Sequence, residues 1–367
     1  MLDCWYNSYM SDNFTKSYKA RFFHVHSDDK IKCDLCPRHC VIGKGQHGFC
    51  LVRQNHGNQM VLTTYGRSSG FCIDPIEKKP LNHFYPGQPI LSFGTAGCNL
   101  GCRFCQNWDI SKAKELDKLQ QTASPAHIAA VCKQLNCVGV AFTYNDPVIF
   151  AEYAIDIAHE CKKLGLKTVA VTAGYITETA RSEFYSVMDA ANVDLKAFTQ
   201  TFYKRLCMVN LEPILDTLIY LKHETNVWFE ITNLIIPTHN DDLTEIAEMT
   251  RWIYKNLGPD VPIHFTGFHP DFKMLDVDST SAELLITAYK IAKDNGLNYV
   301  YTGNVHHEPT ASTYCPNCKK CVIQRDWYEL GEYHIKDNKC GFCNTYLAGV
   351  FPNSKGTWGR KRLPISI

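Results

Sequence analysis

From residue 89 onward, short apolar runs alternate with longer amphipathic stretches, and this alternation restricts the possible folds more than any other feature of the chain. The apolar runs lie at 89–94, 139–144, 167–172, 192–196, 227–236, 263–268 and 298–303. Each run has the length of a buried strand, whereas the stretches between them have the length and spacing of helices. Strand and helix in regular alternation predict parallel βαβ units. We therefore expect an α/β fold in which these units form a partial (β/α)6-type barrel.

The stretches between the predicted strands carry helix start and stop signals. Ser124 suits an N-cap, and Pro125 after it suits the first helical position. Gly165 follows a long amphipathic stretch and suits a left-handed C-cap. In barrels of this kind the active site lies at the C-terminal ends of the strands. Residues that directly follow a strand are therefore the first candidates for function.

Three cysteines directly follow the first predicted strand, within the segment GTAGCNLGCRFCQNW at 94–108. Cys98, Cys102 and Cys105 have the spacing C-x3-C-x2-C. Cysteine thiolates are the usual ligands of iron–sulfur clusters, and three ligands on a four-iron cube leave one iron open to a substrate or cofactor. Half of a zinc site or a redox motif is the alternative, but zinc sites normally use paired knuckles and four ligands. The triplet therefore predicts an iron–sulfur cluster with an open iron.

A second group of cysteines precedes the first strand, in the segment CDLCPRHCVIGKGQHGFC at 33–50. Cys33, Cys36, Cys40 and Cys50 lie in a short stretch rich in glycine, which has little core of its own and would gain from a bound metal. Zinc and a second iron–sulfur cluster both fit this spacing. The alternative is a set of thiols buried beside the first cluster.

Two further pairs of cysteines lie near the C-terminus. Cys315 and Cys318 form one C-x2-C knuckle, and Cys340 and Cys343 form another. Paired knuckles of this kind are typical of a structural Cys4 zinc ribbon. We expect Zn2+ here, with a rubredoxin-like iron site as the competitor. Cys321 lies close by in sequence as a fifth thiol.

These patterns divide the chain into three parts. We expect an N-terminal arm with a Cys-rich leader at 1–88, the barrel at 89–305, and a zinc-ribbon-like module with a tail at 306–367. The start of the chain is polar and aromatic without a regular period, so we expect a poorly organised arm there. Cys4 in this arm has no cysteine near it, and we interpret it as an ordinary thiol.

Cysteine content is the outlier in an otherwise ordinary composition. The 367 residues include 18 cysteines, with a hydrophobic fraction of 45% and a net charge of +1. A net charge so close to zero gives no field that would favour nucleic acid or an acidic membrane. The chain contains no apolar run of about eighteen residues, so no transmembrane helix is predicted. The N-terminus lacks the pattern of a signal peptide. Many cysteines at metal-ligand spacing without an export signal predict a reducing compartment, the cytoplasm.

Polar and charged side chains lie at or near the ends of five predicted strands. They are Tyr144, Asn145, Asp146, Thr172, Asp194, Lys196, Glu230 and His264. Any one of them alone could be a solvated residue at the rim of the barrel. Asp194 and Lys196 differ, because they alternate within one strand and face the same side, where an unpaired charge is costly to bury. Glu230 lies inside an apolar strand and falls under the same argument.

The ordered series of motifs from about residue 33 to 350 resembles the radical S-adenosylmethionine (radical SAM) enzymes. Within that superfamily it is similar to relatives of the pyruvate formate-lyase activating enzymes, and more narrowly to the radical SAM protein of the AmmeMemoRadiSam system. The resemblance is carried by CDLCPRHCVIGKGQHGFC, GTAGCNLGCRFCQNWDIS, FTYNDP, DLKAFTQTFYKRLC, EITNLIIP, FHPDFKM, YTGNV, TYCPNC and CGFC.

The resemblance implies roles for particular residues. The triplet would hold a [4Fe-4S] cluster whose open iron binds SAM. Phe104 and Gln106 would contact SAM through their backbone. Tyr144, Asn145 and Asp146 would form the block that meets the methionine amino group, although that block usually has Glu where Asp146 stands.

The same resemblance extends to the later strands. Asp194 and Lys196 match an Asp-x-Lys pair that engages the ribose and carboxylate region of SAM. Ala173 departs from the family, which usually has Asn in the matching block, so no contact is expected from it. Apart from the resemblance, the predicted strands themselves offer further polar groups for SAM in Thr172, Glu230 and His264.

The implied reaction is reductive cleavage of SAM to methionine and a 5′-deoxyadenosyl radical, which abstracts hydrogen from a substrate that the sequence does not identify. An electron donor such as ferredoxin or flavodoxin would be required, and MEMO-type and AMMECR-type proteins are candidate partners. Two alternatives stay open. One is a glycyl-radical enzyme activase, which shares the core of the chain. The other is a non-enzymatic metal protein, for which the near-neutral charge makes RNA binding a poor fit.

Overall fold

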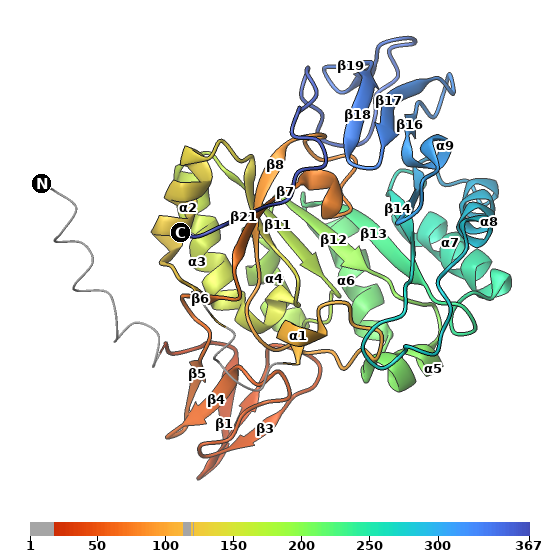
Figure 1. Cartoon of the computed structure of the whole chain (residues 1–367). Coiled ribbons are helices and arrows are strands. Elements are labelled where there is room, and N and C mark those ends of the chain that lie inside the picture. The colour runs from red at the N-terminus through yellow and green to blue at the C-terminus, as the bar shows by residue number, and fades with distance from the viewer. Residues whose placement is uncertain (1–17, 113–118, 120) are drawn as a thin grey trace, which may run out of the picture.

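Seven parallel strands run side by side through the centre of the chain and form most of one nine-stranded sheet (Figure 1). The computed structural model describes residues 18–112, 119 and 121–367, so Cys4 and the first half of the predicted arm lie outside the described residues. In spatial order the sheet is β15-β14-β13-β12-β11-β10-β8-β7-β21. The predicted α/β fold with a mostly parallel central sheet is therefore confirmed.

The seven parallel strands coincide with the seven predicted ones. They are β8 (Pro89–Phe93), β10 (Gly139–Phe142), β11 (Lys167–Thr172), β12 (Ala190–Asp194), β13 (Trp228–Ile235), β14 (Ile263–Gly267) and β15 (Val300–Gly303). Each pairs in parallel with the next strand of the series. Nearly all of their residues are buried. Burial on both faces explains why these strands read as continuous apolar runs rather than alternating patterns.

Two antiparallel strands extend the sheet beyond the predicted barrel segment. Strand β7 (Phe71–Pro75) pairs with β8, and β21 (Leu363–Ile365) pairs with β7. The strands predicted from the sequence begin at residue 89 and end at residue 303, so neither strand was expected in this sheet. The outer strands β15 and β21 do not pair with each other in the part of the chain that the structure describes. Closure into a partial barrel therefore stays a prediction.

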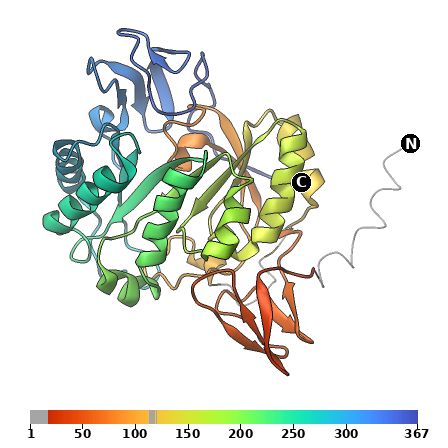
Figure 2. The same ribbon diagram turned by 180° about the vertical axis from the view of Figure 1, so that it is seen from behind.

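Helices lie side by side over one face of the sheet, as the view from behind shows in yellow-green to blue-green (Figure 2). The long ones are α2 (Pro125–Gln134), α3 (Ala151–Lys163), α4 (Glu178–Tyr185), α6 (Glu212–Glu224), α7 (Leu243–Leu257) and α8 (Ala282–Asp294). The predicted cap is present, because the Ser124 hydroxyl accepts from the amide of His127 at 3.2 Å. No helix among the described residues is long and apolar enough to cross a membrane.

Short helices connect the main elements near the sheet ends. They are η1 (Ile76–Lys78), α1 (Trp108–Ser111), η3 (Pro147–Phe150), α5 (Gln200–Phe202), η4 (Tyr203–Cys207) and α9 (Glu308–Ala311). Three of them, α1, η3 and η4, follow closely on strand ends or on the cysteine triplet. Of these three, α1 lines the large cavity described below, whereas no residue of η3 or η4 does.

The Cys-rich leader forms its own small sheets at one end of the main sheet (Figure 1, red and orange). Its strands are β1 (Phe23–Ser27), β2 (Lys30–Cys33), β3 (Val41–Gly43), β4 (Arg53–His56) and β5 (Gln59–Leu62), and β6 (Arg67–Ser68) pairs with β9 (Gln121–Thr122). Arg53 in β4 forms a fully buried ion pair with Glu152 in α3, at 2.8 Å. This pair fastens the leader to the helical layer.

The C-terminal cysteines belong to a separate small module beside the other end of the sheet (Figure 1, blue). It contains β16 (Thr313–Tyr314), β17 (Cys321–Asp326), β18 (Glu329–Tyr333), β19 (Ile335–Lys336) and β20 (Lys339–Cys340). We call this module the ribbon. Val350 joins it to the main body, because its amide donates to the His83 carbonyl at 2.7 Å and its carbonyl accepts from Tyr85 at 2.9 Å.

Candidate active site

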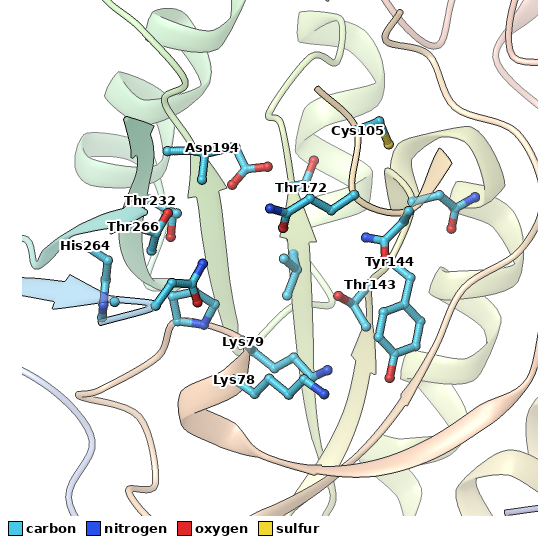
Figure 3. Close-up of a pocket in the computed structure, with 18 of the residues that line it drawn as sticks. Lys78, Lys79, Cys105, Thr143, Tyr144, Thr172, Asp194, Thr232, His264 and Thr266 are labelled. Carbon is cyan, nitrogen blue, oxygen red and sulfur yellow. The ribbon is translucent and has the colours of Figure 1, made fainter. Parts of the chain in front are cut away.

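A cavity of about 790 Å3 takes in all three cysteines of the triplet and the ends of the parallel strands. Figure 3 shows Cys105 toward one end of this cavity, Lys78 and Lys79 toward the other, and Thr172 between them. A volume of this order suits a ligand of cofactor size. The triplet therefore lies at the C-terminal ends of the strands, as the sequence predicted.

The triplet lies on a loop that leaves β8 and packs closely on its surroundings. The amide of Gly97 donates to the Ile110 carbonyl at 3.0 Å. The Cys98 sulfur accepts from the Leu100 amide at 3.5 Å, and the Cys105 sulfur lies 3.1 Å from the Ser111 hydroxyl. All three thiols are free of disulfides. The loop therefore holds the thiols in place and leaves them available as ligands.

Asn145 braces this loop. Its side-chain amide donates to the Gly97 carbonyl at 2.8 Å and to the Thr95 hydroxyl at 3.2 Å, and its oxygen accepts from the Thr95 amide at 3.0 Å. Asn145 was expected to contact the cofactor. The structure directs its polar atoms toward residues 95–97, and Asn145 also lines the cavity, so the contact stays a prediction.

Asp146 and Thr172 form one hydrogen-bonded group on the cavity wall. The Asp146 carboxylate accepts from the Thr172 hydroxyl at 2.9 Å, the Val148 amide at 3.1 Å and the Ala173 amide at 3.0 Å. Burial raises the pKa of Asp146 to about 6, although these donors oppose the shift. The carboxylate also caps η3, so it both starts a helix and faces the cavity.

Asp194 and Lys196 form an ion pair on the cavity wall, with Nζ 2.7 Å from a carboxylate oxygen. Burial alone would lower the pKa of Lys196, but Asp194 and the nearby Cys102 and Cys207 thiols outweigh it and raise the pKa well above its usual value. The lysine therefore stays charged. The expectation that the two side chains face the same side holds in the structure.

Phe104 and Gln106 flank Cys105 on the cavity wall. The Phe104 ring is buried and packs against Phe202, with ring centres 5.7 Å apart. The Gln106 side-chain nitrogen lies 3.0 Å from a ring nitrogen of His269. Their backbones therefore lie beside the triplet, while their side chains have partners of their own.

Of the two predicted site residues Glu230 and His264, only one reaches the cavity. His264 lines the cavity, whereas Glu230 does not. The buried Glu230 carboxylate accepts from the Asn82 amide at 3.0 Å, the His83 amide at 2.7 Å and the Trp228 indole at 3.1 Å, and it lies 2.7 Å from His264. Glu230 thus fixes the segment before β8, and we leave it out of the site proposed below.

Comparison with known proteins connects this arrangement to a family. Residues 93–253 match the model of the radical SAM superfamily. An uncharacterized protein of Methanocaldococcus jannaschii is 36% identical over 327 residues, covering 89% of this chain and 97% of that protein. This chain belongs to the radical SAM superfamily.

Other relatives of this radical SAM protein are more distant. Pyruvate formate-lyase 1-activating enzyme of Escherichia coli is 26% identical over 177 residues, covering 45% of this chain and 70% of the enzyme. Among solved structures, a domain of the pyruvate-formate lyase-activating enzyme of Bacteroides vulgatus matches with a TM-score of 0.40 at 22% identity, covering 45% of this chain and 99% of the domain. A radical SAM methyltransferase of Sphaerobacter thermophilus matches with a TM-score of 0.48 at 13% identity, covering 78% and 77% of the two chains.

Membership implies an enzyme that uses a [4Fe-4S] cluster and SAM, and the donor set of the triplet fits such a cluster. Among the described residues, the one group of three or more ligand atoms lying within 4.8 Å of one another belongs to the ribbon. The triplet sulfurs are spread more widely than the ligands of a single ion. Three free thiols around a cavity of cofactor size suit a larger inorganic group with one position left for a ligand.

A charged network at the far end of the cavity escaped the sequence analysis. Buried Asp74 in β7 accepts from Lys79 at 2.7 Å, from Lys78 at 3.1 Å and from the Tyr144 hydroxyl at 2.7 Å. Burial alone would raise the pKa of Asp74, but these donors, Lys79 foremost, outweigh it and lower the pKa. The sequence signal was present, because an aspartate stands in the apolar run FCIDP just before EKK. The predicted cofactor contact Tyr144 belongs to this network.

Two further features around the site were also missed. The Cys207 thiol in η4 hydrogen-bonds the Cys102 thiol, and this bond together with burial raises the pKa of Cys102 well above its usual value. Cys207 does not itself line the cavity. The ribbon contributes Arg325, Trp327 and Tyr328 to the cavity wall. A module predicted from its cysteines alone thus also shapes the active site.

The ribbon cysteines converge as expected for a metal site. Cys315 and Cys343 sulfurs lie 3.5 Å apart, and Cys318 and Cys340 sulfurs lie 3.7 Å apart. A tetrahedral zinc site with bonds of about 2.3 Å places its sulfurs about 3.8 Å apart. The fifth thiol, Cys321, is not part of the group. The Cys4 group is therefore compatible with metal binding.

Proposed function

We propose that this protein cleaves SAM reductively at the triplet and uses the resulting 5′-deoxyadenosyl radical to abstract hydrogen from a substrate. The observation that supports this most is the convergence of Cys98, Cys102 and Cys105 with the Asp194–Lys196 pair on one cavity of about 790 Å3. When bound, the cluster supplies the electron that breaks the sulfur–carbon bond of SAM, since this chemistry belongs to the cofactor. The chain supplies the binding groups described next.

We assign different parts of SAM to different polar groups on the cavity wall. The Lys196 ammonium is charged and buried, so it suits the SAM carboxylate, and Asp194 suits the ribose hydroxyls. Asp146 and Thr172 offer oxygen acceptors for the methionine amino group. In this assignment Asn145 acts on the loop that carries Cys98, as a positioning residue.

Several parts of the protein line the cavity around the proposed SAM site. The backbones of Phe104 and Gln106 line the SAM side, and His264 lines the wall near Thr232 and Thr266 (Figure 3). The ribbon covers another side through its own side chains. These walls would limit the access of solvent to a reactive radical.

The cofactors and partners belong to the same proposal. We assign Zn2+ to Cys315, Cys318, Cys340 and Cys343, because the sulfur spacing matches one tetrahedral ion. Ferredoxin or flavodoxin would supply electrons in a reducing cytoplasm. Membership of the AmmeMemoRadiSam system, with MEMO-type and AMMECR-type proteins as partners, rests on the motif series given above.

A glycyl-radical enzyme activase is the second candidate, because the Escherichia coli relative is a pyruvate formate-lyase activating enzyme. The leader and ribbon weigh against it, since the activating enzymes lack both. An activase would also have to admit a polypeptide loop to a cavity that the ribbon partly covers. We therefore place a small molecule or a dedicated protein partner ahead of a glycyl-radical substrate.

Anaerobic turnover tests the proposal. Reconstituted protein mixed with SAM and dithionite should release 5′-deoxyadenosine, measured by liquid chromatography and mass spectrometry. Cys102→Ala should abolish the product, whereas Cys161→Ala, a buried thiol in α3 away from the cavity, should not. Absence of product from iron-loaded protein would refute the proposed reaction. An EPR doublet on a glycine-containing peptide would favour the activase.

A further inference from the structure

We propose that Cys33, Cys36, Cys40 and Cys50 hold a second [4Fe-4S] cluster, placed to carry electrons toward the triplet. All four residues line one enclosed cavity of about 20 Å3 in the leader. The turn between β2 and β3 brings them together, because the Cys33 amide donates to the Cys40 carbonyl at 2.9 Å. All four thiols are free.

The spacing of these thiols distinguishes a cluster from a single zinc ion. A zinc site needs sulfurs about 3.8 Å apart, and the ribbon cysteines of the same chain already have that spacing. In the leader, by contrast, no three of the four sulfurs all lie within 4.8 Å of one another, as judged over the described residues. The four thiols line one common space, at a spacing wider than a single zinc ion requires. Four cysteines around such a space match the Cys4 ligand set of a [4Fe-4S] cluster.

A buried donor without an acceptor points to the same group. Arg53 lines the cavity and is only 1% exposed. Its two terminal nitrogens pair with Glu152, but its Nε–H has no hydrogen-bond partner among the described residues. Leaving a buried donor unpaired is unfavourable, so an unmet donor on a cavity wall indicates a missing acceptor. Cluster sulfurs accept such bonds, and the guanidinium offsets negative charge.

Apart from Arg38, Gly48 and Asn99, the remaining walls of this cavity are apolar. Leu35, Ile42, Val148 and Ile149 are all buried and line it. The last two come from η3 at the end of β10, so the main body covers one side of the leader site. Apolar walls of this kind keep water away from a cluster and tune its reduction potential.

The leader site lies directly against the triplet loop. The Cys50 carbonyl contacts the backbone of Gly97, the residue before Cys98. On the other side of Cys98, Asn99 lines the leader cavity, and Arg38 donates to the Asn99 carbonyl at 2.5 Å. Cys98 itself lines the large cavity. The backbone around Cys98 thus forms the partition between the two sites, and Cys50 of the leader site contacts the residue that precedes Cys98.

This position suits a relay of single electrons. The leader cluster would accept one electron from a reduced donor protein such as ferredoxin or flavodoxin and pass the same electron to the iron held by the triplet, with no bond formed or broken. This role rests on the proposed function, whereas the existence of the cluster does not. The two parts can therefore be tested apart.

Metal analysis tests the site itself. A variant with Cys98→Ala, Cys102→Ala and Cys105→Ala cannot hold the triplet cluster. After anaerobic reconstitution it should retain about four irons and four sulfides per chain, and wild-type protein should hold about twice as many. Adding Cys36→Ala and Cys40→Ala should remove this iron, whereas Cys161→Ala in its place should not. Absence of iron and sulfide from the triple variant, whether or not it binds zinc beyond the one equivalent assigned to the ribbon, would overturn the proposal, as would about four irons in the wild type.

EPR of the reduced protein tests the relay placement. Two paramagnetic clusters as close as the two sites should broaden each other in fully reduced wild-type protein. The triple variant should give a single signal without that broadening. Two independent signals in the wild type that simply add would contradict the relay, even if both clusters are present. Failure of SAM cleavage would leave both measurements unaffected, so it would count against the proposed function alone.

Discussion

Asp146 takes part in several local interactions at once. One carboxylate caps η3, holds Thr172 and the Ala173 amide, and faces the cavity. The sequence alone could place Asp146 after a strand, but it could not show which groups the carboxylate hydrogen-bonds. The same limit applies to Asn145, because its role depends on which backbone atoms of residues 95–97 come within reach. Residue types near strand ends are therefore predictable as a group, whereas their individual tasks require the folded loop.

Asp146→Asn should change how stability depends on pH. The folded pKa is about 6, because burial favours the neutral acid, whereas an unfolded aspartate titrates near 3.9. The native state therefore holds more protons between pH of about 4 and 6, and this residue's contribution to stability is lost as pH rises through that window. The variant should be less stable by about 1–3 kcal/mol below that window, and the difference should shrink as pH rises. Urea unfolding at several pH values measures this.

Exposed Asp278→Asn is the matched control for that experiment. It should show no trend with pH relative to the wild type over the same range. A constant difference between wild type and Asp146→Asn from pH 4 to 7 would contradict the raised pKa.

Lys196→Met should weaken SAM binding. The charged ammonium is held by Asp194 at 2.7 Å and faces the cavity, so its loss removes one charge-assisted contact. Such a contact contributes about 1.5–3 kcal/mol, which corresponds to an increase in Kd of roughly 10- to 100-fold. Equilibrium dialysis of SAM against anaerobically reconstituted protein measures the change. Exposed Lys204→Met serves as control, and equal Kd values for Lys196→Met and wild type would exclude the assigned contact.

At the scale of elements, the strands followed from the sequence where burial on both faces produced long apolar runs. Strands β7 and β21 could not be predicted in this way. The segment of β7 contains Asp74 and Pro75, which interrupt its apolar run. Strand β21 has only three residues, and its partner strand lies far away along the chain. Together they form the antiparallel end of the sheet, with β21 outermost. Pairing of distant segments is a tertiary effect that local patterns do not encode. The network around Asp74 was missed for the same reason.

Gly97→Ala tests the contact between the leader and the triplet loop. Gly97 has φ of +82°, and a Cβ there would overlap the Cys50 carbonyl, so the loop carrying Cys98 must shift. We expect loss of iron after reconstitution. Gly165→Ala is the matched control, because φ is +69° but a Cβ meets nothing within 4 Å. It should cost only about 1–2 kcal/mol of stability and retain iron. Full iron content in Gly97→Ala would show that the contact is not required.

Cys315→Ala tests the ribbon as a metal-bound element. The variant should lose about one equivalent of zinc and keep its iron, because the ribbon sulfurs form a group apart from the other cysteines. Cys321→Ala should keep both metals, since that thiol lies outside the group. Elemental analysis by mass spectrometry distinguishes these outcomes. Loss of iron from Cys315→Ala would make the ribbon an iron site.

At the scale of the whole molecule, three cysteine groups sit around one sheet, with the leader and the ribbon at different ends of it (Figure 1). The sequence predicted all three groups from their spacing. It did not predict that the ribbon reaches the large cavity through Arg325, or that Cys50 touches the loop of the triplet. Both relations connect segments far apart in the chain. They make the two accessory modules part of the active-site architecture rather than appendages.

The central claim is that the triplet holds a cluster with one iron open to SAM. EPR of dithionite-reduced protein, in a Cys36→Ala and Cys40→Ala background that removes leader iron, tests it most directly. The account predicts a reduced-cluster signal whose shape changes when SAM is added, and no such signal in the same background with Cys102→Ala. A cluster signal that is identical with and without SAM would contradict it.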